Sequence, residues 1–295
     1  MSSHSPRALH GVLLFLCAVV LFACQDACAK YLTAHWPIAL LAWVRYTVHF
    51  SLMSALLLPH RGRDLLRTRR PVAQVLRGLC LVSVTVLMMT AFQRLPLAEA
   101  TTIMFASPLL VVLASRPLLQ ERIGALRWAA VLVGFAGVLL ITRPGGGLDP
   151  WGVAAALAAS VVYAVYQLMT RQLSSTETPA TLLYYTALTG VFCLSFGLPA
   201  NAFGRAAAPY EYGLMLALGV LGGGSHYLLT RAFREAPASL LSPLSYTQLI
   251  WAGLLGWIIF GDRPGAGAGL GMLVVAASGV LIALDSRRAT ARPAS

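Results

Sequence analysis

AFQRLP, at residues 91–96, recurs as AFREAP at residues 232–237, a shift of 141 positions. The same shift aligns further pairs: Gly11 with Gly152, Lys30 with Arg171, Phe105 with Tyr246, and Glu121-Arg122 with Asp262-Arg263. Self-similarity at a fixed period indicates an internal repeat. The chain is therefore expected to consist of two related units, residues 1–147 and 148–295.

The composition is that of a protein embedded in a lipid bilayer. Of the 295 residues, 58% are hydrophobic and 11% are charged, and the mean hydropathy is +0.74. A soluble domain carries about 25% charged residues. The net charge of +12 does not indicate a nucleic-acid partner, because the basic residues lie between apolar runs and form no single patch. The five cysteines lie inside apolar runs and are expected to be buried thiols.

Ten apolar runs approach the length of about 20 residues that a membrane-spanning helix needs. They lie near residues 9–29, 37–59, 72–93, 99–118, 124–142, 150–170, 180–199, 211–232, 239–260 and 265–284. Each unit then holds five helices, and an odd number places the second unit upside down in the membrane. The predicted fold is an all-α polytopic protein with two inverted five-helix repeats, an arrangement typical of secondary transporters.

Basic residues predict which side of the membrane holds the termini. With both termini inside, the inner segments hold sixteen arginines: Arg7, Arg61, Arg63, Arg67, Arg69, Arg70, Arg77, Arg116, Arg122, Arg127, Arg171, Arg231, Arg234, Arg287, Arg288 and Arg292. The outer segments hold five basic residues: Lys30, Arg94, Arg143, Arg205 and Arg263. This asymmetry predicts an inner-membrane protein with both termini in the cytoplasm.

The first apolar run ends in FACQDACAK, residues 22–30, which allows three interpretations. It could be a secretory signal peptide, because Ala27-Cys28-Ala29 resembles a cleavage site. It could be a lipoprotein signal that ends at Cys24. It could also be a retained helix with functional polar groups. The repeat favours the retained helix, because its partner, residues 152–171, lies deep inside the chain.

Several motifs resemble the EamA-like family of the drug/metabolite transporter superfamily. They are FACQDACAKYL at 22–32, WVRY at 43–46, AFQRLPLAEATTIMFASPLL at 91–110, QER at 120–122, FAGVL at 135–139, APA at 236–238 and PLSYT at 243–247. The resemblance covers nearly the whole chain. It implies transport and leaves the substrate open, since members export amino acids, other metabolites or opine-type metallophores, or import riboflavin or S-adenosylmethionine.

In the first unit, ionisable groups at membrane depth are the candidate substrate ligands, because such groups are costly there. Asp26 and Lys30 are four residues apart and are expected to pair on their own helix, or else Gln25 and Asp26 border the transport pathway. Arg45 either grips a substrate carboxylate or is locked to Asp26. His49, four residues further on, either carries protons or is structural.

The second unit offers a stripe of polar and aromatic residues at helical spacing. Tyr163, Tyr166 and Gln167 either line a cavity or only pack, and Gln167 stands at the repeat position of Asp26. The remaining candidates are Thr102, Phe105, His226, Tyr246, Gln248 and Trp251. Two acids outside this set are expected to have structural roles. Glu99 is expected to stabilise the start of its helix, because a negative charge there interacts favourably with the helix dipole. Asp262 is expected to lie in a loop and to orient the neighbouring helices.

These features predict a secondary transporter that takes a small polar, amino-acid-derived solute, with export favoured over metabolite uptake. A membrane-embedded enzyme is a distant alternative, because protease motifs, phosphate loops and zinc helices are lacking. No cofactor, metal site or ATP-binding site is expected. The glycine-rich runs at 124–142 and 265–284 are expected to hold the two units together or to form a homodimer.

Overall fold

The computed structural model describes residues 6–119, 124–142, 147–199, 202, 204 and 206–290, and the regular structure in these residues is helical. The elements are α1 (Pro6–Thr33), α2 (Ile38–Arg61), η1 (Gly62–Leu66), α3 (Pro71–Arg94), α4 (Leu97–Met104), α5 (Ser107–Leu119), α6 (Ala125–Thr142), α7 (Pro150–Leu173), α8 (Pro179–Phe196), α9 (Pro209–Glu235), α10 (Ala238–Leu241), η2 (Ser242–Tyr246), α11 (Thr247–Phe260) and α12 (Ala266–Thr290).

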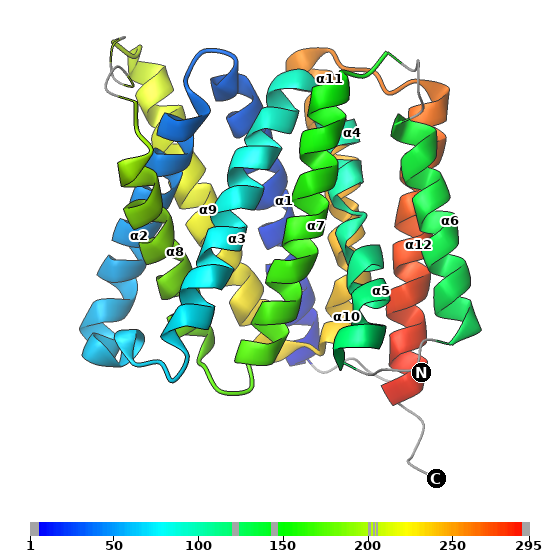
Figure 1. The fold of residues 1–295 in the computed structure, drawn as a ribbon, viewed down its shortest axis with the longest axis horizontal. Helices are drawn as coiled ribbons and strands as arrows, with labels where there is room; N and C mark the ends of the chain where they lie inside the picture. The colour runs from blue at the N-terminus through cyan, green and yellow to red at the C-terminus, as the bar shows by residue number, and fades with distance from the viewer. Residues whose placement is uncertain are drawn as a thin grey trace.

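The prediction of ten apolar helical segments is confirmed. Within the described residues, eight segments are long and apolar enough to cross a membrane, and two shorter apolar helices cover Trp128–Thr142 and Ala266–Ile282. The helices stand roughly parallel in one bundle, and the start of α1 and the end of α12 lie at its lower end in Figure 1. We call the opposite end of the bundle the far end.

The packing of the helices follows the inverted repeat. Helix α1 packs against α9, and its repeat counterpart α7 packs against α3. In the same way α2 packs against α9, and α8 packs against α3. Two further pairs, α2 with α8 and α6 with α12, join a helix to its own counterpart. Each of these contacts thus has a counterpart under the 141-residue shift, or is its own counterpart, as a pseudo-twofold axis in the membrane plane requires.

The fourth segment of each repeat is broken at an equivalent position. In the first repeat α4 ends at Met104 and α5 begins at Ser107. In the second, α10 gives way to the 3₁₀ turn η2, and α11 begins at Thr247. Pro108 and Pro243 lie at these breaks, where the missing N–H of proline prevents a continuous helical ladder. Phe105 and Tyr246 therefore occupy matching positions at the two interruptions.

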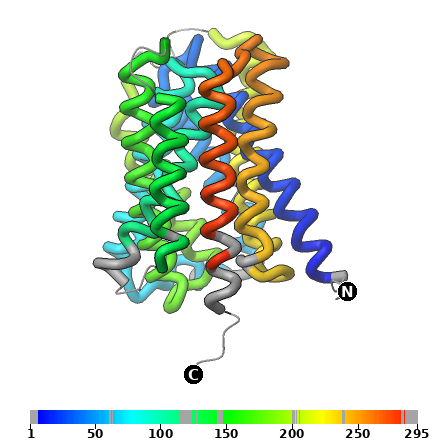
Figure 2. The backbone as a smooth tube through the Cα atoms, turned by 90° about the vertical axis from the view of Figure 1, so that its right-hand side faces the viewer, coloured from blue at the N-terminus to red at the C-terminus, as the bar shows by residue number. Residues whose placement is uncertain are grey.

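Helices α6 and α12 join the two repeats at one edge of the bundle (Figures 1 and 2). Their backbones approach closely because both carry glycine at the contact. A Cβ atom on Gly271 would lie 2.7 Å from the carbonyl oxygen of Gly137. One on Gly137 would lie 3.0 Å from the carbonyl oxygen of Gly271. The glycine-rich runs thus hold the two repeats together, which is the first of the two roles expected from the sequence.

Proline and capping residues position several helix starts. Pro71, Pro150, Pro179 and Pro209 each stand in the first turn of a helix, where a missing N–H costs nothing. The Asp149 side chain accepts a hydrogen bond from the Gly152 amide at 2.7 Å and so caps α7. Helix α2 runs through Pro59 to Arg61, slightly beyond the predicted run.

The structure differs from the sequence expectations at Arg77 and at the cysteines. Arg77, one of the sixteen arginines assigned to the inner segments, lies within α3 and is 1% exposed. Removing it from the count leaves the asymmetry of basic residues intact. The expectation of buried cysteines is wrong: Cys17 and Cys193 are exposed, and Cys24, Cys28 and Cys80 are half-buried. An apolar helix in a membrane presents side chains outward as well as toward its neighbours, so an apolar run does not by itself imply burial. All five cysteines are free thiols. Glu121 and Arg122 lie outside the described residues.

Candidate functional site

Six of the predicted site residues form one polar group between the repeats, which we call the central cluster. It contains Gln25 and Asp26 from α1, Arg45 and His49 from α2, His226 from α9 and Gln248 from α11. Gln248 Nε2 donates a hydrogen bond to Asp26 Oδ2 at 3.0 Å. The imidazoles of His49 and His226 stack with their centroids 6.0 Å apart.

Glycines of α9 allow α2 and the Gln25 side chain to approach this helix closely. A Cβ atom on Gly222 would lie 2.7 Å from Gln25 Oε1 and 3.6 Å from Arg45 Nε. One on Gly223 would lie 3.3 Å from the His49 ring. The glycine run in α9 therefore makes room for Gln25, Arg45 and His49 on one face of the helix.

Two buried polar atoms of the central cluster have no hydrogen-bond partner among the described residues. They are Gln25 Oε1 and His49 Nε2, and both residues are almost fully buried. Most buried polar atoms in proteins are hydrogen-bonded. These two atoms therefore suit a role in binding a polar group that is not part of the chain.

The expected pair of Asp26 with Lys30 is not the one that the structure forms. Lys30 Nζ donates to the carbonyl oxygen of Leu95 at 2.6 Å and lies 3.7 Å from Asp262 Oδ2. Asp26 binds Gln248 instead. The i,i+4 spacing allows contact on one helix, but tertiary partners compete for both side chains. Among the described residues, Asp26 thus has no cationic side chain in direct contact.

Arg45 has a neutral hydrogen-bond partner. Its Nη1 donates to Thr85 Oγ1 of α3 at 3.0 Å, and Thr85 also bonds the Tyr46 hydroxyl at 3.1 Å. Arg45 and Asp26 interact electrostatically, but no ion pair of the described residues joins them. Of the two interpretations of Arg45, the direct lock to Asp26 is therefore not formed.

Tyr163, Tyr166 and Gln167 form a second group on α7. The rings of Tyr163 and Tyr166 stack with centroids 5.6 Å apart. Gln167 Nε2 donates to Ser107 Oγ at 3.5 Å. Under the 141-residue shift, Gln167 corresponds to Asp26 and Ser107 to Gln248. The bond from Gln167 to Ser107 is thus the repeat counterpart of the bond between Gln248 and Asp26, and both tie one repeat to the broken helix of the other.

Arg77 anchors the second group, and the sequence interpretation missed it. Its guanidinium donates to the Tyr166 hydroxyl at 3.1 Å, to Thr186 Oγ1 at 2.7 Å, to Thr170 Oγ1 at 3.4 Å and to the carbonyl oxygen of Leu182. The available signal was its position, nearly two turns inside an apolar run. A guanidinium there needs partners from neighbouring helices.

The other predicted residues lie apart from the central cluster. The rings of Phe105 and Tyr246 meet at 5.1 Å, so the matching breaks of the two repeats touch. The Thr102 hydroxyl bonds the carbonyl oxygen of Ala98 on its own helix. Trp251 is 38% exposed, and none of the described contacts joins it to the cluster. Phe22, which was not predicted, packs edge-on against His226 at 5.1 Å.

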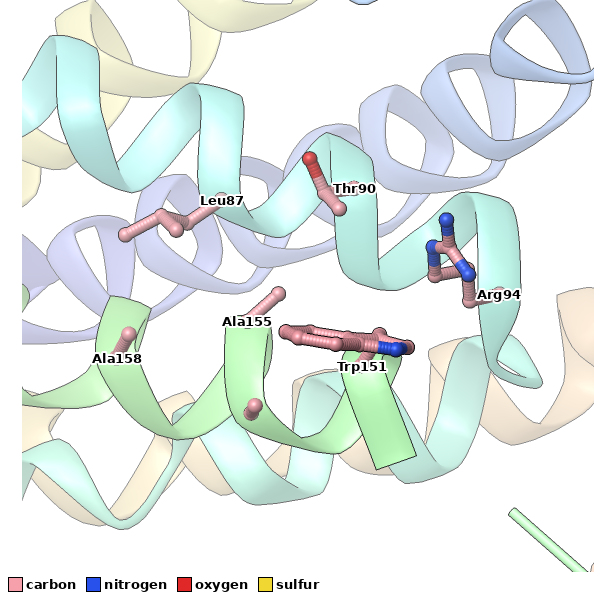
Figure 3. Close-up of a pocket in the computed structure, with 7 residues that line it drawn as sticks. Leu87, Thr90, Arg94, Trp151, Ala155 and Ala158 are labelled. Carbon is pink, nitrogen blue, oxygen red and sulfur yellow. The ribbon is translucent and has the colours of Figure 1, made fainter. Parts of the chain in front are cut away.

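A pocket lies outside both groups, in the groove between α3 and α7 (Figure 3). It has a volume of about 360 Å³, and its lining residues are Leu87, Thr90, Arg94, Trp151, Ala154, Ala155 and Ala158. Arg94, the last residue of α3 and at the right of the pocket in Figure 3, pairs with Asp149 at 3.5 Å. Among the described residues, no group of three or more His, Cys, Asp or Glu side chains could hold a metal ion.

The sequence matches the EamA-like transporter family over residues 9–143 and 150–284. Similar curated proteins differ in what they carry. A riboflavin transporter of Rhizobium johnstonii is 26% identical over 98% of this chain and 95% of its own. An S-adenosylmethionine uptake transporter of Rickettsia prowazekii is 25% identical over 95% of this chain and 94% of its own. A pseudopaline exporter of Pseudomonas aeruginosa is 29% identical over 92% of this chain and 93% of its own.

The fold is also similar to that of a protein of known crystal structure. The two superpose with a TM-score of 0.64 at 25% sequence identity, over 97% of this chain and 98% of the other. The resemblance thus extends over the whole bundle.

Proposed function

We propose that this chain, which belongs to the EamA-like transporter family, is a secondary transporter for a zwitterionic, amino-acid-derived metabolite. The solute binds at the central cluster, and the two inverted repeats expose this cluster to one side of the membrane at a time. One observation carries the choice of solute. Arg45 and Asp26 belong to the same cluster, yet each is held by a neutral partner and not by the other.

Two separated charges of opposite sign suit a solute that carries both. The guanidinium of Arg45 can bind a carboxylate through two parallel hydrogen bonds. The carboxylate of Asp26 can accept from an ammonium group. Gln25 Oε1 and His49 Nε2 offer further polar contacts, because no group of the described residues forms a hydrogen bond with them. The ring of Phe22 beside His226 gives an apolar side chain a surface to lie on.

Export is the proposed direction of transport. The pseudopaline exporter of Pseudomonas aeruginosa supports it, with 29% identity over 92% of this chain. Uptake is the second candidate, and the S-adenosylmethionine uptake transporter of Rickettsia prowazekii favours it. The proposed location is the cell inner membrane with both termini in the cytoplasm, which the distribution of arginines supports. A homodimer remains a proposal without a specific contact to support it.

The substrate class is tested with purified protein in liposomes. Counterflow is measured for amino acids, for amino-acid derivatives including S-adenosylmethionine, and for riboflavin. Solutes with both a carboxylate and an ammonium should exchange, and methyl esters or N-acetyl forms of the same solutes should not. Exchange of riboflavin alone, or equal exchange of the blocked forms, would contradict the proposal. Comparing the metabolites of medium and cells, with and without the gene, decides the direction.

A further inference from the structure

Lys30 ties several helices together at the far end of the bundle. Its ammonium donates to the carbonyl oxygens of Leu95 and Phe92 at the end of α3, at 2.6 and 3.3 Å. It lies 3.7 Å from Asp262 Oδ2, just after α11, and 5.2 Å from the centre of the Phe260 ring. The positive charge of Lys30 is thus balanced by Asp262, and the contact joins the two repeats.

A second carboxyl group, that of Glu99, lies beside this pair. Glu99 stands in the first turn of α4 and is 5% exposed. Its Oε2 atom is buried and has no hydrogen-bond partner within the part of the chain that the structure describes. The charged groups that act on it are Lys30 from α1 and Asp262 from the segment after α11. Among the described residues, the other helices that pack on α4 bring no further charge to it.

The charges of these three side chains do not balance if all are ionised. One ammonium would face two carboxylates, and a net negative charge would remain in a poorly hydrated place. Asp262 is in contact with the ammonium, whereas Glu99 forms no ion pair with it. Burying an unpaired carboxylate is strongly unfavourable, and a buried acid usually takes up a proton instead.

We propose that the far end contains a proton-binding site at Glu99, held beside the Lys30–Asp262 ion pair. A bound metal cation fits less well, since it would need several oxygen ligands. The carbonyl oxygens of Phe92 and Leu95 already accept from Lys30. The site is distinct from the central cluster and does not depend on which solute is carried. Separating α1 from α3 and α11 would break the Lys30 contacts and admit water, so the proton of Glu99 would leave to solvent as that end opens.

The proton is observed by infrared spectroscopy of the purified protein at neutral pH. A protonated carboxyl has a C=O stretching band that a carboxylate lacks. The wild type should show this band, and Glu99→Gln should lose one carboxyl's share of it. Asp149→Asn, at a more exposed acid paired with Arg94, is the matched control and should leave the band unchanged. An identical band in wild type and Glu99→Gln overturns the proposal.

Thermal unfolding gives a second test. Glutamine imitates a protonated glutamate, so Glu99→Gln should keep the melting temperature of the wild type at neutral pH. Asp262→Asn removes the ionic partner of Lys30 and should lower it. An equal fall in Glu99→Gln would mean that Glu99 is ionised, which overturns the proposal. If Glu99→Gln does not accumulate, Glu99→Asp should shift the carboxyl band, and an unshifted band overturns it.

The two proposals fail separately. Liposomes that show no solute flux would end the proposed transport function and leave the carboxyl band in place. A missing band would end the proton site and leave the flux in place.

Discussion

Arg45 and Asp26 each carry a charge inside an apolar helix, and each is held by one neutral side chain. Thr85 holds Arg45, and Gln248 holds Asp26. Removing one charge therefore leaves the partner of the other intact. A mutation of Arg45 or Asp26 is therefore expected to affect substrate binding more than stability, because the contact with the neutral partner differs from the proposed contact with the solute.

Arg45→Gln should accumulate in the membrane at the wild-type level and lose transport of carboxylate-bearing solutes. A hydrogen bond to a charged group contributes about 1.5–3 kcal/mol, which corresponds to about 10- to 100-fold in apparent affinity. Arg45→Lys should recover little, because an ammonium lacks the planar fork. The measurement is counterflow in liposomes beside membrane abundance. Normal abundance with unaltered flux would show that Arg45 does not bind the solute.

Arg77 should behave in the opposite way. Its guanidinium is buried and binds four groups of α7 and α8. Arg77→Gln leaves several of these groups without a partner, so the free energy of unfolding should fall by about 3 kcal/mol. Arg67→Gln is the control, because the Arg67 side chain is 85% exposed. Thermal unfolding of the purified proteins measures both, and equal melting temperatures would contradict the anchoring role.

At the scale of helices, the contact of α6 with α12 depends on glycine at defined positions. Gly271 of α12 faces the backbone of Gly137, whereas Gly269 of the same helix has open space around it. The difference follows from helical geometry, since residues two apart point in different directions. Helix α12 therefore offers a contact position and a control position within one turn.

Gly271→Ala should destabilise the protein, and Gly269→Ala should not. The methyl group at 271 would meet a carbonyl oxygen and force the helices apart, which costs about 1–3 kcal/mol. At position 269 the added methyl group has no atom within 4 Å. Alanine there lowers the conformational entropy of the unfolded chain, so the free energy of unfolding should rise by about 0.4–1 kcal/mol. Melting temperatures of the two variants check this. A stable Gly271→Ala protein would show that the helices separate at little cost.

At the scale of the whole molecule, the chain consists of two inverted repeats. The fourth helical segment of each repeat is broken, and the two breaks touch through Phe105 and Tyr246. The hydrogen bonds from Gln248 to Asp26 and from Gln167 to Ser107 relate the two repeats in the same way. An inverted pair can exchange the conformations of its halves, which is the basis of alternating access. The proposed orientation of this bundle in the membrane rests on the distribution of its basic residues.

A cytoplasmic reporter fused after Ser295 should be active, and a periplasmic reporter at the same place inactive. The physical reason is that arginines concentrate in the segments on the side of the termini. A periplasmic reporter inserted at Gly146, between the repeats, should be active. Activity of the opposite reporters would reverse the orientation, and a cytoplasmic signal at Gly146 would contradict five spans in the first repeat.

The sequence by itself determined the class of fold. Apolar length, helix-breaking residues and the 141-residue repeat are properties of the chain read along its length, and they predicted ten helical segments in two inverted repeats. The same information brought Gln25, Asp26, Arg45, His49 and Gln248 forward as candidates, because polar groups stand out in apolar runs. It also showed that Gln167 stands at the repeat position of Asp26.

Only the tertiary structure decided which polar groups meet. Helical spacing suggested that Asp26 pairs with Lys30, but Lys30 binds Asp262 and the end of α3. The sequence shows Arg77 only as a charge inside an apolar run, and its hydrogen-bond partners on α7 and α8 come from the packing of these helices. Such contacts depend on how each helix is rotated and how closely its neighbours approach. That is set by packing positions far apart in the chain, such as Gly222 against Gln25, and not by the local pattern around either residue.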